Sequence, residues 1–123
     1  MKWISLVAGG ILGTIMRYIV SGWIYRMAGN QFPYGTLVVN LIGCFVIGFL
    51  AAFFGEKFFL GHNGQLFLVT GFCGAFTTFS ALVLETATLM QDGHLLRGFL
   101  NVMLSMIFGL LVFRAGTLLA EIF

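Results

Sequence analysis

The chain has very little charge for its length. Only 8% of its 123 residues are Asp, Glu, Lys or Arg, whereas 60% are hydrophobic, and a soluble domain carries about 25% charged residues. The six Lys and Arg residues stand singly, so no basic patch for a nucleic acid is present. These absences exclude a soluble domain and a nucleic-acid-binding protein. They indicate an integral membrane protein, and the length allows one domain.

Cysteine and proline are also scarce. Cys44 and Cys73 lie within apolar runs without the spacing of a zinc site or redox pair, so we expect buried thiols that act as small packing residues. Pro33 is the only proline and is expected to separate two helices. His62 and His94 fall in expected loops, and no Ser-His-Asp set or metal-ligand cluster is recognisable. We therefore do not expect an enzyme.

Apolar runs account for nearly all of the chain. A helix that crosses a bilayer needs about 20 mainly apolar residues, and four runs are long enough. The first run follows Lys2, but it is too long for a signal peptide and has no small-residue cleavage site, so we expect a retained helix. We predict an all-α integral membrane fold, a single transmembrane domain over residues 1–123 with spans at about 3–25, 36–54, 66–90 and 95–119.

Ten residues of the third run do not suit a continuous membrane helix: Gly71-Phe72-Cys73-Gly74-Ala75-Phe76-Thr77-Thr78-Phe79-Ser80. They include two glycines, two adjacent threonines and a serine. Irregular backbone at membrane depth is tolerated only where protein buries it or where it lines a wet cavity. We therefore predict that the third helix is broken at the bilayer midplane, which is typical of a binding or conduction site.

The distribution of Lys and Arg residues hardly predicts how the chain is oriented in the membrane. An even number of spans puts both termini on one side, with Lys2 and Lys57, whereas Arg26 and Arg97 fall on the other. Arg114 could add to the terminal side. Orientation normally follows an excess of Lys and Arg in cytoplasmic loops. A weak bias could suffice, a partner subunit could dictate orientation, or copies could insert both ways up and pair head to tail.

Three charged residues lie inside the expected spans, where a charge at the bilayer centre costs about 2.5–3.5 kcal/mol. Arg17 either attracts anions into a vestibule or extends its long stem to the interface. Glu85 follows the break and is expected to pair with an arginine or to cap freed amides. Arg114 lies near the chain end and is expected to reach the interface.

Polar side chains in the second and fourth spans suggest a site with contributions from several helices. Asn40 is the only strongly polar side chain of the second span, and it either bonds a neighbouring helix or serves a site. Asn101, Ser105 and Gly109 fall four residues apart and form a narrow stripe, which simple packing also explains. Together with the broken helix, these features favour one shared site.

The residues after the break suit a small anion. The edge of an aromatic ring is positive, so Phe79 can stabilise an anion without adding a fixed charge. The side chains of Thr78, Ser80 and Asn40 would add hydrogen-bond donors.

Three groups of residues together form a signature that is highly specific for one protein family. They are Gly9-Gly10, Gly13 and Arg17-Tyr18; then Pro33-Tyr34-Gly35-Thr36-Leu37-Val38-Val39-Asn40-Leu41-Ile42-Gly43; and then the segment 71–80. By these residues the chain resembles, over essentially its whole length, the small bacterial fluoride channels of the Fluc, or CrcB, family. The resemblance implies an antiparallel dual-topology dimer with two narrow pores in the cell (inner) membrane, which exports fluoride from the cytoplasm by passive flux.

The resemblance also implies roles for particular residues. A structural sodium ion at the dimer centre would be held by the backbone carbonyls of Gly74 and Thr77 from both subunits, in line with the preference of hard cations for oxygen ligands. Arg17 matches the vestibule arginine. The fluoride path would comprise the positions Asn40, Thr78, Phe79, Ser80, Leu82, Ser105 and Gly109.

Three positions depart from the family pattern. Leu82 stands where the family usually has a second phenylalanine, Gly109 aligns with the serine of a Gly-Ser pair, and Phe113 aligns with a later hydroxyl. Leucine has no aromatic ring edge and glycine has no hydroxyl. The chain could therefore be a weakly conducting or non-conducting partner subunit of a heterodimeric fluoride channel.

A small multidrug exporter is a further alternative, because it also has four spans and a similar length. That family needs a carboxylate in the middle of its first span, whereas the first span here holds Arg17 and no Asp or Glu. The sequence therefore counts against this alternative.

Overall fold

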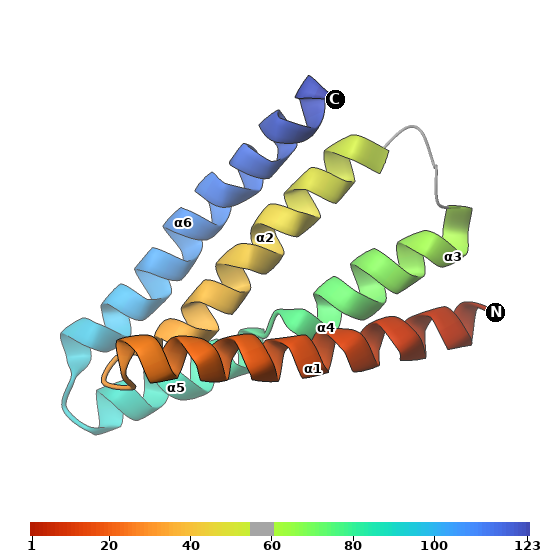
Figure 1. Ribbon diagram of the computed structural model, residues 1–123. Helices are drawn as coiled ribbons and strands as arrows, with labels where there is room; N and C mark the ends of the chain where they lie inside the picture. The colour runs from red at the N-terminus through yellow and green to blue at the C-terminus, as the bar shows by residue number, and fades with distance from the viewer. Residues whose placement is uncertain (55–60) are drawn as a thin grey trace.

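The computed structural model describes residues 1–54 and 61–123, and all the regular structure in these two ranges is helical (Figure 1). Lys57, which we expected on the same side as the two termini, lies outside the described residues. The elements in chain order are α1 (Lys2–Ala28), α2 (Tyr34–Phe54), α3 (Gly61–Gln65), the π-helix η1 (Leu66–Cys73), α4 (Gly74–Phe76), α5 (Phe79–Gln91) and α6 (Leu95–Ile122).

Four helical segments are long and apolar enough to cross a membrane. The shortest, α2, has 21 residues, which at 1.5 Å per residue span about 32 Å and match a hydrocarbon core of about 30 Å. The four segments are Lys2–Ala28, Tyr34–Phe54, Gly61–Gln91 and Leu95–Ile122. They confirm the expectation of an all-α chain with four long apolar helices, whereas the single-domain assignment stays a prediction.

Close backbone contact joins α1 to η1. A Cβ atom on Gly9 would collide with the carbonyl oxygen of Phe67, and one on Gly13 would collide with the carbonyl oxygen of Phe72. These two glycines are the buried residues of α1. Because packing in a membrane depends on such close approaches, these two glycines fix where α1 lies along η1.

A second pair of helices, α2 and α6, runs parallel. A Cβ atom on Gly48 would collide with the carbonyl oxygen of Phe113, and one on Gly116 would collide with the carbonyl oxygen of Phe45. In Figure 1 this pair diverges from α1 and η1 toward the two chain termini. The molecule therefore consists of two tightly packed pairs that meet near the connections between α1 and α2 and between α5 and α6.

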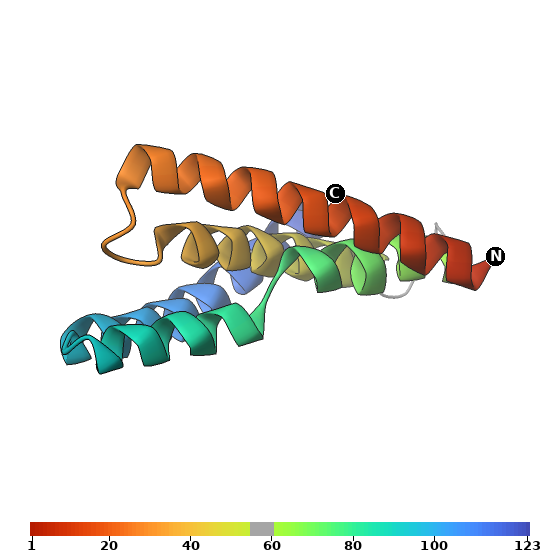
Figure 2. The same ribbon diagram turned by 90° about the horizontal axis from the view of Figure 1, so that it is seen from below.

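The third apolar segment is not one continuous helix. After α4 the backbone becomes extended at Thr77 (φ −87°, ψ 157°) and Thr78 (φ −150°, ψ 113°), and α5 begins at Phe79. Figure 2 shows this extended link between α4 and α5, and beyond it α5 lies beside α6. A Cβ atom on Gly98 of α6 would come within 2.9 Å of Met90 in α5, which shows how closely these helices pack.

Candidate functional site

Asn40 holds the extended link in place. Its Oδ1 accepts a hydrogen bond from the backbone N–H of Thr78 at 2.8 Å, and its Nδ2 donates to the Thr78 carbonyl at 3.2 Å. One side chain of α2 thus satisfies both backbone groups of the residue at which the third segment leaves the helix. Asn40 therefore bonds the third segment at its extended link, and one N–H of its amide remains for another acceptor.

This arrangement removes the helical partners of two carbonyl groups. In a continuous helix the N–H of residue 78 would donate to the carbonyl of Gly74, and the N–H of residue 81 would donate to that of Thr77. Here the Thr78 N–H bonds Asn40, and the Ala81 N–H bonds the Thr78 side chain Oγ1 at 3.2 Å. The carbonyls of Gly74 and Thr77 are therefore left without these donors, and Gly74 lies on the exposed surface of the chain.

The side chains around the break face in two directions. Phe79 is 75% exposed and Ser80 is also exposed, whereas Leu82 is only 7% exposed and packs inside the chain. The hydroxyls of Thr78 and Ser80 lie 3.4 Å apart. The structure thus brings Asn40, Thr78 and Ser80 together beside an outward-facing Phe79, but it places Leu82 among core residues.

The polar stripe of α6 faces the neighbouring helices. Asn101 is only 1% exposed, and its Nδ2 donates to the Thr86 hydroxyl in α5 at 3.0 Å. Its Oδ1 and the Ser105 Oγ are buried without a hydrogen-bond partner among the described residues. A Cβ atom on Gly109 would lie 3.5 Å from the Cys44 sulfur. Asn101 was not among the predicted path residues, and in the structure it joins α6 to α5.

Glu85 has a different partner from those expected. Its Oε1 accepts a hydrogen bond from the Thr36 hydroxyl at 2.6 Å, whereas its Oε2 is buried without a partner among the described residues. Glu85 also lines a cavity of about 640 Å³ together with Asp92, His94 and Arg97. Neither an arginine nor a freed amide bonds Glu85 in the part of the chain that the structure describes.

The two arginines inside the spans have different environments. Arg17 is half-buried, and its Nε is enclosed without a partner among residues 1–54 and 61–123. Arg114 is exposed and one of its guanidinium nitrogens donates to the Thr117 hydroxyl at 3.4 Å. Of the two, only Arg17 has a buried donor without a hydrogen-bond partner among the described residues.

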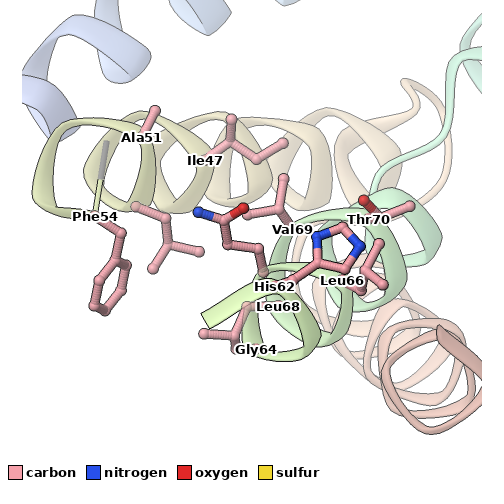
Figure 3. A pocket seen from close by; sticks show the side chains of 11 residues that line it. Ile47, Ala51, Phe54, His62, Gly64, Leu66, Leu68, Val69 and Thr70 are labelled. Carbon is pink, nitrogen blue, oxygen red and sulfur yellow. The ribbon is translucent and has the colours of Figure 1, made fainter. Parts of the chain in front are cut away.

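A cavity of about 340 Å³ between α2 and η1 lies away from these groups (Figure 3). Its walls are mainly apolar side chains such as Ile47, Leu66 and Val69, with His62, Gln65 and Thr70 as polar exceptions. None of the predicted site residues lines it. The break, and not this cavity, is therefore the candidate site.

Metal binding by side chains finds no support in the described residues. No group of three or more His, Cys, Asp or Glu side chains lies close enough to hold a metal ion within this part of the chain. The carbonyls of Gly74 and Thr77 are instead oxygen ligands of the kind that hard cations prefer.

The chain is similar to known proteins over nearly its whole length. Residues 4–117 match the family described as "CrcB-like protein, Camphor Resistance (CrcB)". A protein of Desulforapulum autotrophicum is 37% identical over 121 residues, which cover 98% of this chain and 97% of the relative. A protein of Rhizobium johnstonii is 41% identical over 119 residues, which cover 91% of this chain and 95% of the relative. Both relatives are named "Fluoride-specific ion channel FluC".

Proposed function

The chain belongs to the CrcB-like protein family, and on this basis we propose that it is a fluoride-specific ion channel through which fluoride leaves the cytoplasm by passive flux. The relatives that carry this name match nearly all of the chain. The protein is a multi-pass membrane protein with four apolar segments long enough to span a bilayer. This function requires a route along which protein groups take the place of the water molecules that a small anion loses.

The observation that carries the proposal is the pair of hydrogen bonds between the Asn40 side chain and the backbone of Thr78. These bonds stabilise the interruption of the helix. Beside the interruption lie the remaining N–H of the Asn40 amide, the Thr78 and Ser80 hydroxyls and the exposed ring of Phe79. Thr78 Oγ1 accepts from the Ala81 N–H, and either of the Thr78 and Ser80 hydroxyls donates to the other, so one of their two protons is available for donation. The donors are neutral, so they can stabilise fluoride without trapping it, and a ring edge adds positive electrostatic potential.

Arg17, Ser105 and Gly109 complete the proposed path. The half-buried guanidinium of Arg17 raises the local concentration of anions at the entrance, as fixed positive charge does in a cleft. Ser105 contributes a hydroxyl with no partner among the described residues. Gly109 leaves room beside Cys44 but supplies no donor.

The break also fits a structural sodium ion. The carbonyls of Gly74 and Thr77 lack their helical donors, and Gly74 is exposed where a second subunit would approach. A sodium ion bound there would supply positive charge and hold the two breaks together. We propose that these carbonyls from two subunits hold it, with no acidic side chain needed.

The proposed assembly is an antiparallel dual-topology dimer in which both breaks lie at the bilayer midplane. Arg26 and Arg97 stand at one end of the spans and Lys2 at the other, so the charges favour neither orientation strongly. The exposed Phe79 and Ser80 and the half-buried Arg17 would then be covered by the second copy or by water instead of lipid. The partner is either identical or a homologous subunit.

A second candidate function is that of a weakly conducting or non-conducting partner subunit. The observation in its favour is the burial of Leu82, which stands where the family pattern predicts a second ring and is 7% exposed. Gly109 also removes a hydroxyl from the path. In this case a homologous subunit with both rings would restore flux.

Ion efflux from liposomes tests the proposed function. Liposomes that contain the purified protein are loaded with potassium fluoride or potassium chloride, and release is followed with ion-selective electrodes after valinomycin is added. We expect rapid fluoride release and chloride release no faster than from protein-free liposomes. Fluoride release at the protein-free rate, from the chain alone and with a co-expressed homologue, would reject the channel function.

A further inference from the structure

The connection between α1 and α2 and the first turn of α6 line a half-open cavity of about 610 Å³ at one end of the spans, and Arg97 is exposed in it. Because α1, α2 and α6 are all candidate membrane spans, their ends lie at a membrane surface. The cavity is separate from the break and from the cavity shown in Figure 3. It is lined by Ala28, Gly29, Asn30, Gln31, Phe32, Tyr34 and Arg97.

The lining of this cavity suits an anion. Arg97 is its only charged side chain, and the amides of Asn30 and Gln31 and the hydroxyl of Tyr34 are further donors. The first turn of α6, which contains Arg97, holds no acidic residue that could neutralise it. A guanidinium group binds phosphate through two parallel hydrogen bonds, and amide donors beside it add specificity.

The adjoining cavity shows why an anion would choose this side of Arg97. The two cavities share Asn30, Gln31 and Arg97, but the adjoining cavity of about 640 Å³ also contains the carboxylates of Glu85 and Asp92. These negative charges repel an anion there. Arg97 lies between the two cavities, and on the side of the smaller one no carboxylate among the described residues lines the wall.

Apolar surface beside the cavity indicates that the anion is attached to a lipid. Phe32 and Tyr34 pack with ring centroids 5.0 Å apart and form one wall. Leu96 and Phe99, which lie on other faces of the first turns of α6 than Arg97, are 70% and 61% exposed and add apolar surface at the same end of the spans. A free inorganic anion would gain nothing from this surface, whereas acyl chains would bury it. Aromatic residues at this depth are typical of the headgroup region.

We propose that this cavity binds the phosphate of an anionic phospholipid headgroup, held by Arg97 with Asn30 and Gln31, while the acyl chains lie along the first turns of α6. This binding does not depend on the ion that the protein carries. Basic pockets at span ends are known to suit such headgroups.

Native mass spectrometry of the purified protein tests the proposal. Protein equilibrated with an equal mixture of phosphatidylglycerol and phosphatidylcholine should retain phosphatidylglycerol preferentially. Arg97→Gln should reduce this preference about tenfold, and Arg97→Lys should keep part of it. Arg26→Gln is the matched control, because Arg26 is exposed at the same end but does not line the cavity.

Three outcomes would overturn the proposal. One is equal retention of the two lipids by the unmodified protein. Another is an equal loss of phosphatidylglycerol from Arg97→Gln and Arg26→Gln, because the attraction would then be a general charge effect. The third is displacement of the lipid by millimolar inorganic phosphate, which would identify a site for free anions. Retention in excess phosphate supports a headgroup site.

Discussion

The third apolar segment and α6 are comparable in length and apolar character, but they differ in which groups form hydrogen bonds with their backbone N–H and C=O groups. The segment from Gly61 to Gln91 has 31 residues and α6 has 28. All of α6 is one helix, whereas the third segment passes through α3, η1 and α4, becomes extended, and resumes as α5. Its extended link depends on hydrogen bonds from side chains, chiefly that of Asn40 in α2.

This difference shows where an apolar chain can carry function. Hydrophobicity alone places both segments in a membrane, but a continuous helix pairs its own backbone N–H and C=O groups with each other by hydrogen bonds. The interrupted segment offers backbone carbonyls as well as hydroxyls for a ligand, whereas α6 offers side chains such as the Ser105 hydroxyl. Variants that disturb the side-chain support should therefore affect the third segment more strongly than equivalent variants affect α6.

The largest effect on stability is expected from Asn40→Ala. This change leaves the N–H and the carbonyl of Thr78 without their partner, at about 1–3 kcal/mol for each buried group. Asn101→Ala in α6 is the comparison, because it removes one hydrogen bond between side chains and should cost about 1 kcal/mol. Thermal unfolding of the purified proteins in one detergent measures both. Equal destabilisation would show that the break does not depend on Asn40.

Contact between α1 and η1 should be the next most sensitive feature. Gly9→Ala drives a methyl group toward the Phe67 carbonyl, whereas Gly10→Ala meets no atom within 4 Å. We expect Gly9→Ala to destabilise the protein by about 1–3 kcal/mol. The neighbouring Gly10→Ala should leave the monomer's packing unchanged and serves as the control. The same thermal measurement applies, and equally stable variants would contradict the close approach.

Thr78→Ala should have a smaller effect. Thr78 is the N-cap of α5, and its side chain accepts from the Ala81 N–H. Loss of such a cap costs about 1 kcal/mol. Thr78→Ser keeps the hydroxyl and should retain most of the stability and the fluoride efflux. If the serine variant is as unstable as the alanine variant, the cap is not what stabilises the start of α5.

The smallest change is expected from Leu82→Phe. A second ring edge would contribute about 1 kcal/mol to anion stabilisation, which corresponds to a several-fold increase in fluoride efflux. Leu82 is buried within the chain, so the ring must displace its neighbours to reach the path. Efflux from the Leu82→Phe protein that equals that of the unmodified protein would show that this ring is dispensable. The idea of a specialised subunit would then lose its support.

The sequence allowed much of the fold to be predicted. Apolar runs of sufficient length predicted the four long helices, because the period and composition of a membrane helix are local properties. Glycines, threonines and a serine within one run likewise pointed to the interruption. The connections at Pro33 and His94 were also predicted, whereas His62, which was expected in a loop, lies in α3.

Tertiary contacts could not be predicted in the same way. The π-helix over Leu66–Cys73 has no signature in its composition, and it packs against the buried Gly9 and Gly13 of α1. The bonds from Asn40 to Thr78 and from Thr36 to Glu85 join residues 38 and 49 positions apart. Which face of α5 is exposed also depends on packing, so Phe79 and Leu82 were expected together but face opposite environments.

Fluoride efflux from Asn40→Asp liposomes tests the central claim most directly. Aspartate keeps an oxygen that accepts the Thr78 N–H but places negative charge beside the path and removes the amide donors. Gln91→Glu, at the exposed C-terminal end of α5, adds the same charge away from the break. We predict that Asn40→Asp protein folds and loses nearly all fluoride efflux while Gln91→Glu retains it. Undiminished efflux from folded Asn40→Asp protein would show that fluoride does not pass the break.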